Sequence, residues 1–194
     1  MIQYPKGQKQ LSRATRSQTM ETNYSSRGMG LEHILNQTNE LYRLQKRAVI
    51  HKKPTPIQVV KVNYPARSAA QITEAYFRQA STTDYNGVYK GRYIDFEAKE
   101  TKNKTSFPLK NIHMHQLEHM KECCDQGGIA FVIFYFSSLK EYYLLEYKWI
   151  EQFINHSSST RQSIPLTYIR EKGKEIQLSL QMTLNYLDAV DTLL

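Results

Sequence analysis

Residues 93–100 alternate between apolar and charged side chains, which is the pattern of a β-strand with one buried face. Successive side chains of a strand point to opposite faces, so one face carries apolar residues that suit a core: Ile94, Phe96 and Ala98. The other face carries three charged residues: Asp95, Glu97 and Lys99. The pattern therefore predicts a strand with one apolar face for the core and a second face that sets two carboxylates and one ammonium side by side.

Apolar positions elsewhere predict helices and strands on both sides of this strand. Helical spacing predicts a helix that begins near Arg27 and continues through Tyr42, and a second helix over 111–125 that ends at two glycines. The continuous apolar run 130–136 predicts a strand buried on both faces. The remaining predicted elements are strands at 47–51, 141–145, 164–169 and 176–180, a short strand and turn at 88–93, and helices at 149–154 and 184–194.

A stretch at about 55–82 interrupts this series and predicts a projection, or stalk. Pro54 and Pro56 at its start exclude a central strand there. The stretch holds too little apolar material for a core of its own, so we expect strands and one helix, the helix opening with a capping box at Ser68. Tyr76 then either stacks on bases or packs this helix against its strands.

The composition indicates which class of partner the chain binds and in which compartment we expect it. The chain of 194 residues has a net charge of +8, which favours a polyanionic partner. It contains no apolar run long enough for a membrane span and no signal-type N-terminus. Its two cysteines are adjacent, which favours a reducing, cytoplasmic location. We expect a disordered basic arm at 1–22 and a single folded domain at 23–194.

The charged face of the 93–100 strand becomes a candidate metal site if another acid lies near it. Asp84 precedes Asp95 by one short strand and turn, so a hairpin can return it to the same end of the sheet. Neighbouring carboxylates repel each other unless a cation lies between them, and hard cations such as Mg²⁺ bind carboxylate oxygens. The alternative is an ordinary solvated face of an exposed strand.

The stretch from Ser81 to Thr101, with Asp84 followed by Asp95-Phe-Glu97-Ala-Lys99, resembles the catalytic motif of the PD-(D/E)-x-K nucleases. Within that superfamily it resembles the RecU-type Holliday junction resolvases closely. The resemblance extends to three other stretches: 51–56, 73–77 and 107–113. Thr83, where the superfamily has proline, departs from the general pattern but fits the resolvase branch.

The resemblance implies a restriction-endonuclease-like α/β (α+β) fold, in which helices flank a mixed central sheet and a stalk protrudes into the DNA junction. It implies Mg²⁺-dependent cleavage of four-way DNA junctions in recombination and repair, with Mn²⁺ as a substitute, by a homodimer that meets recombinase and branch-migration proteins. Asp84, Asp95 and Glu97 would hold the metal, and Lys99 would orient the attacking water or stabilise the transition state.

Further residues are candidates around this centre. Glu32 and Gln116 are additional site candidates on the two long helices, and Glu32 is otherwise a solvated glutamate. The candidate DNA contacts are Arg27, Lys52, Lys53, Arg67, Tyr76, Phe77 and Arg78. His115 and His119 have the helical spacing of a zinc pair, but no third ligand is evident from the sequence.

Two other functions remain open at this point. One is a nuclease for other branched or duplex DNA, which the catalytic motif does not distinguish from a resolvase. The other is a non-enzymatic DNA-binding modulator of recombination, which the presence of all four motif residues disfavours.

Overall fold

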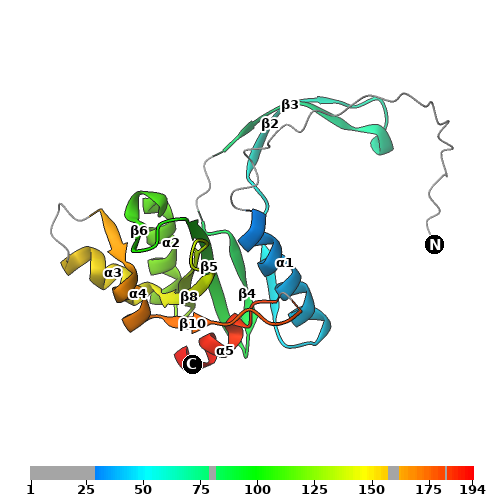
Figure 1. The fold of residues 1–194 in the computed structure, drawn as a ribbon. Helices are drawn as coiled ribbons and strands as arrows, with labels where there is room; N and C mark the ends of the chain where they lie inside the picture. Colours follow the sequence, from blue (N-terminus) through cyan, green and yellow to red (C-terminus); the bar gives the residue numbers. More distant parts are fainter. Residues whose placement is uncertain (1–28, 79–81, 157–161, 182) are drawn as a thin grey trace, which may run out of the picture.

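The computed structural model describes residues 29–78, 82–156, 162–181 and 183–194, and a six-stranded mixed sheet lies at its centre (Figure 1). The strands lie in the order β1-β4-β5-β7-β8-β10, and within this sheet β5 and β7 are parallel whereas the other pairs are antiparallel. Their bounds are β1 (Val49–Lys52), β4 (Tyr85–Tyr89), β5 (Arg92–Thr101), β7 (Ile129–Phe136), β8 (Glu141–Glu146) and β10 (Lys174–Ile176).

Helices cover both faces of this sheet. On one face, α1 (Met29–Leu44) and α5 (Tyr186–Val190) pack on a core in which Phe96 stacks between Tyr85 and Phe131, with ring centroids 4.8 and 4.9 Å apart. On the other face lie α2 (Met114–Asp125), α3 (Tyr147–His156) and α4 (Leu166–Lys172). The expected mixed sheet with flanking helices is confirmed. No described helix is long and apolar enough to cross a membrane.

The predicted projection is present, but it is a β-hairpin without a helix. β2 (Ile57–Asn63) and β3 (Gln71–Phe77) pair antiparallel, and every residue of both strands is exposed. A single 3₁₀ turn, Arg67–Ala69, forms the tip, which stands away from the sheet in Figure 1. The helix predicted after Ser68 is therefore wrong. A short helix with nothing to pack against is marginal, whereas the paired strands satisfy each other's backbone groups.

The C-terminal third contains a second correction. The predicted strand at 164–169 is mostly helix, because only Ser163–Pro165 (β9) pairs with β6 (Ser106–Pro108), and α4 then begins at Leu166. Leu166 and Ile169 are both buried, which fits the three-residue spacing of one helix face. The strand predicted at 176–180 lies earlier, as β10, and 3₁₀ residues Asp191–Leu193 complete the closing helix.

Strand register brings the motif residues together. In the β4–β5 pair Tyr85 faces Phe96 and Asn86 faces Asp95, so Asp84 continues the ladder opposite Glu97. β1 lies on the outer side of β4 and ends where Lys53 donates its backbone N–H to the carbonyl of Asp84, at 2.7 Å. The site is thus built across three adjacent strands, each held by its neighbour's hydrogen bonds.

Candidate active site

Glu97 is the centre of the first cluster of charged residues. Its side chain is 2% exposed and lies on the α2 side of β5, as the alternation predicts. The backbone N–H of Asp84 donates to Glu97 Oε2 at 3.1 Å, and Lys99 Nζ lies 2.9 Å from Glu97 Oε1. The structure therefore brings together three of the four predicted catalytic residues at one end of the β4–β5 ladder.

The electrostatics of Glu97 favour a bound cation. Burial raises its pKa to about 7; the nearby Lys99 ammonium opposes this rise, and the Asp84 carboxylate adds to it. A buried acid beside a second acid is costly to ionise, and a divalent cation between them removes that penalty. The donors are carboxylate oxygens, which fit Mg²⁺.

Asp95, the fourth predicted residue, is the centre of a separate cluster. Its carboxylate is fully buried and meets four groups. Lys53 Nζ and the Tyr93 hydroxyl each donate to Oδ2 at 2.8 Å, His119 Nε2 lies 3.2 Å from the same oxygen, and Thr83 donates its hydroxyl to Oδ1. A buried carboxylate is tolerable only with such partners. Lys53, predicted as a DNA contact, is thus held inside the protein beside Asp95.

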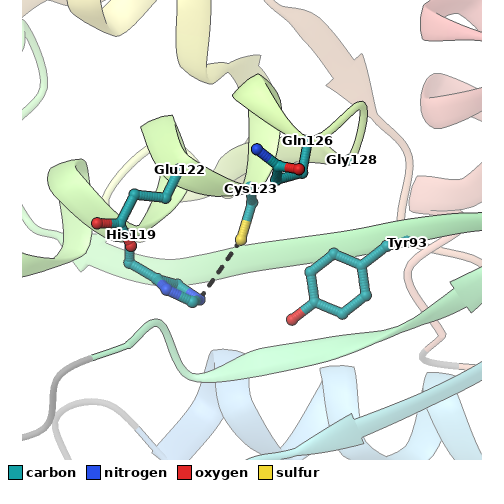
Figure 2. Close-up of a pocket in the computed structure, with 6 residues that line it drawn as sticks. All are labelled: Tyr93, His119, Glu122, Cys123, Gln126 and Gly128. Atoms are coloured by element: carbon teal, nitrogen blue, oxygen red, sulfur yellow. Dashed lines mark hydrogen bonds between the residues drawn. The ribbon is translucent and has the colours of Figure 1, made fainter.

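A pocket of about 400 Å³ opens next to Asp95, between Tyr93 and the last turns of α2 (Figure 2). Its lining consists of Tyr93, His119, Glu122, Cys123, Gln126 and Gly128. Cys123 Sγ lies 3.6 Å from His119 Nε2, and burial raises the pKa of this thiol to about 11. The ligand atoms of Asp95, His119 and Cys123 all lie within 4.8 Å of one another.

This trio differs from the histidine pair expected from the sequence. The His115 ring stacks on that of His113, with centroids 5.5 Å apart, whereas His119 Nε2 lies against Asp95 and Cys123. The partners of His119 come from strand β5 and from Cys123, one helical turn further along α2. The i, i+4 spacing of His119 and Cys123 was visible in the sequence, but nothing local to it pointed to Asp95.

The two additional site candidates both have other partners. Glu32, on α1, forms an ion pair with Lys52, and its backbone carbonyl accepts from the Tyr85 hydroxyl at 3.5 Å. Gln116 is buried, and its side-chain oxygen accepts the backbone N–H of His113 at 3.0 Å in a capping box at the start of α2. Their roles at the metal site stay predictions.

The candidate DNA contacts are spread along the hairpin and its base. Tyr76 and Phe77 are 62% and 83% exposed, so Tyr76 does not pack a helix against strands. Arg78 is exposed at the base of the hairpin, and Arg67 lies in the turn at the tip. Arg27 and the predicted arm at 1–22 lie outside the described residues.

Comparisons with known proteins match most of the chain to one family. A family model described as Recombination protein U matches residues 26–192. A relative named Holliday junction resolvase RecU, from Latilactobacillus sakei subsp. sakei (strain 23K), is 52% identical over 199 residues, covering 98% of this chain and 95% of the relative. Relatives of the same name from Bacillus cereus (strain G9842) and Bacillus thuringiensis (strain Al Hakam) are 52% and 53% identical over 194 residues, covering 98% of this chain and 97% of each relative.

Among solved structures, Hjc from Archaeoglobus fulgidus, described as a Holliday junction resolvase from an archaeal hyperthermophile, overlaps with 70% of this chain and 93% of its own. The sequence identity is 10% and the TM-score is 0.38, which is too low to support an inference.

Proposed function

The chain belongs to the Recombination protein U family, and on that premise we propose that it is a structure-specific endonuclease that resolves four-way Holliday junctions in DNA recombination and repair. The observation that supports this proposal most strongly is the Asp84–Glu97–Lys99 cluster. It places two acids and a largely buried ammonium at one end of a ladder whose sequence matches the family's motif.

We assign the catalytic roles as follows. Asp84, Glu97 and Asp95 supply the carboxylates for the metal, with Mg²⁺ as the ion and Mn²⁺ as a substitute. A bound divalent cation would polarise the scissile phosphate and lower the pKa of an attacking water. Lys99, held by Glu97, presents its ammonium where it orients that water or stabilises charge on the phosphate. We propose Glu32 and Gln116, on α1 and α2, as additional contributors to this centre.

We propose that the hairpin grips the junction. Its exposed basic and aromatic side chains match a phosphate-lined opening with accessible bases, where each stacked base contributes about 1–3 kcal/mol. Resolution requires matched nicks in two opposing strands, so we propose a homodimer whose two sites are related by symmetry. Recombinase and branch-migration proteins are the partners that fit this task, and the cytoplasm is the compartment.

The test is cleavage of four DNA substrates of matched sequence: a four-way junction, a Y-shaped fork, a linear duplex and a plasmid. We expect symmetric nicks in the four-way junction with Mg²⁺ or Mn²⁺, little cleavage with Ca²⁺, and none with EDTA. Equal cleavage of forks or duplex would favour a nuclease for other DNA. Tight junction binding without cleavage under any metal would favour a non-enzymatic modulator.

A further inference from the structure

We propose that Asp95, His119 and Cys123 form a second metal site, selective for Zn²⁺, beside the catalytic carboxylates. The three side chains differ in chemistry from the all-oxygen set at Asp84 and Glu97. A thiolate and an imidazole favour Zn²⁺ over Mg²⁺, which prefers oxygen ligands. The proposed zinc site and the proposed catalytic site are connected, because Asp95 belongs to both sets of ligands.

The distances between ligand atoms fit tetrahedral zinc. With Zn–S of about 2.3 Å and Zn–N of about 2.0–2.1 Å, tetrahedral angles separate sulfur from nitrogen by about 3.6 Å and nitrogen from oxygen by about 3.3 Å. The observed separations are 3.6 Å for Cys123 Sγ to His119 Nε2 and 3.2 Å for His119 Nε2 to Asp95 Oδ2. All three atoms lie within 4.8 Å of one another, so a small closing movement completes the set.

The ligands stand on rigid elements. Asp95 lies in the middle of β5, between β4 and β7, and its carboxylate is oriented by hydrogen bonds from Thr83 and Tyr93. Such supporting bonds are usual around a metal ligand. His119 and Cys123 lie one turn apart on one face of α2. Gly128 lets the chain turn tightly at the end of α2 beside β5, because a Cβ there would lie 2.8 Å from the Cys123 carbonyl oxygen and 3.2 Å from the Tyr93 ring.

The pocket supplies an entrance and a fourth ligand position. Figure 2 shows His119 and Cys123 on one wall and the Tyr93 ring on the other. A volume of about 400 Å³ holds several water molecules, so an ion bound to three side chains can keep one water as its fourth ligand.

The position of Lys53 indicates that the surroundings of Asp95 and His119 favour a positive charge. Its ammonium lies 2.8 Å from Asp95 Oδ2 and 3.4 Å from His119 Nε2. When Zn²⁺ binds, the Zn–S bond forms as the Cys123 thiol proton leaves to water, and Lys53 swings out on its flexible stem. Zinc then occupies Asp95, so it inhibits cleavage; this consequence rests on the proposed function.

The chain offers a matched pair of cysteines for the test. Cys124 follows Cys123 on α2, but its side chain packs against the hydrophobic core between α2 and the sheet, away from Asp95. The experiment uses the full-length protein, reduced and metal-free, with Zn²⁺ or Co²⁺ alone as the probe. Binding is followed by competition with a chromophoric chelator and by the thiolate-to-Co²⁺ charge-transfer band in the near ultraviolet.

We expect one equivalent of Zn²⁺ and a clear thiolate band in the wild type and in Cys124→Ser. Cys123→Ser should lose the band and bind Zn²⁺ more weakly, by at least the roughly 10–100-fold seen when a supporting residue is lost. Cys123→Ala is a second variant in case serine disturbs folding, with circular dichroism as the check. A thiolate band of wild-type strength in both Cys123 variants would overturn the site.

The cleavage arm separates this proposal from the proposed function. With Mg²⁺ in excess, micromolar Zn²⁺ should inhibit the wild type and Cys124→Ser but leave Cys123→Ser active. Equal inhibition of all three proteins, or zinc binding at Cys123 without inhibition, would show that zinc does not occupy Asp95. If the wild type cuts no DNA at all, the proposed function is wrong, and the binding arm still decides the site.

Discussion

Two carboxylates two residues apart on β5 have different neighbours. Glu97 lies beside Asp84 and Lys99, whereas Asp95 lies beside Lys53, Thr83 and the pocket. Each acid therefore has its own lysine. Both acids are proposed to hold the same metal, but their different partners predict separable effects of substituting them on catalysis and stability.

At the first cluster, Asp84→Asn and Glu97→Gln should each slow junction cleavage by about 100-fold or more, because each removes charge that would hold the metal. Single-turnover cleavage with saturating Mg²⁺ measures the effect, and gel mobility shift should show junction binding retained. Asp125→Asn is the matched control, since Asp125 is an exposed acid paired with Lys121 on α2. Wild-type rates in both site variants would refute the assignment.

Glu97 also predicts a pH dependence of stability in the metal-free protein. Its pKa of about 7, raised mainly by burial from the ordinary 4.5, means that the folded protein keeps a proton which the unfolded chain has already released between these values. The stabilisation is complete below about pH 4.5 and is lost as the pH rises through 7, on the order of 1–3 kcal/mol.

Urea unfolding of the protein in EDTA at several pH values measures this loss. Glu97→Gln should remove it, so that the variant becomes the more stable protein at pH 7.5. Saturating Mg²⁺ should flatten the wild-type slope as well. A wild type and a Glu97→Gln variant with parallel pH profiles would argue against the raised pKa.

At the second cluster, Lys53→Met should destabilise the protein by about 1–3 kcal/mol, because it leaves the buried Asp95 carboxylate with fewer donors. Asp95→Asn removes the charge that Lys53 neutralises, so the double variant should be less destabilised than the sum of the single variants. Denaturant unfolding of the four proteins gives the coupling free energy. A coupling near zero would mean that the ion pair is not formed in solution.

At the scale of elements, the strands with long apolar patterns and the helices α1, α2 and α3 were predictable, whereas the short segments that became β3 and α4 were assigned to the wrong type. β5 and β7 follow directly from alternation and from an unbroken apolar run. The hairpin was predicted as a projection, yet Ile72, Ala75 and Tyr76 also fit one helix face, and only pairing with β2 decides for a strand. The α4 segment is short, and its apolar positions fit both a helix and a strand. Its contacts with the sheet therefore determine which of the two it forms.

The candidate site shows the same limit. Asp84, Glu97 and Lys99 were predictable because a short hairpin fixes their register. The cluster around Asp95 joins β1, β5 and α2 across 66 residues of sequence, from Lys53 to His119, and no local spacing encodes that contact.

The hairpin is the element whose removal is most informative. Arg78 donates its backbone N–H to the carbonyl of Pro56 at 3.0 Å, so the two legs are adjacent and a short Gly-Ser turn can replace residues 57–77. Because all residues of β2 and β3 are exposed, we expect the shortened protein to keep its fold by circular dichroism and the proposed dimer by light scattering.

The shortened protein should nevertheless lose its preference for four-way junctions over linear duplex, measured by competition binding. Tyr76→Ser with Phe77→Ser, in the full-length chain, tests the aromatic contribution alone. Retained junction preference in the shortened protein, or its failure to fold, would mean that the hairpin is not the recognition element.

For the whole molecule, a net charge of +8 predicts that DNA affinity falls steeply with salt, whatever the DNA shape. Selectivity for a junction must then come from geometry, which does not depend on total charge. The proposed active site lies on the sheet and the hairpin reaches away from it, so on the proposed function discrimination and cleavage would belong to different parts of the molecule (Figure 1).

Those parts meet at the base of the hairpin. One leg leaves the sheet just after Lys53, and the second leg is described as far as Arg78, a few residues before the chain joins the sheet at Thr83 and Asp84, so both legs lie close in sequence to residues of the two clusters. We expect thermodynamic linkage from this arrangement: a junction that fixes the legs would also fix Asp84, and a metal held by Asp84 would stiffen the legs. Ca²⁺, which we expect to bind without supporting cleavage, should therefore tighten junction binding by the full-length protein and leave its affinity for linear duplex unchanged. In the protein without residues 57–77, Ca²⁺ should change neither affinity. Binding of a junction to that protein would then no longer favour the metal-bound state that cleavage requires.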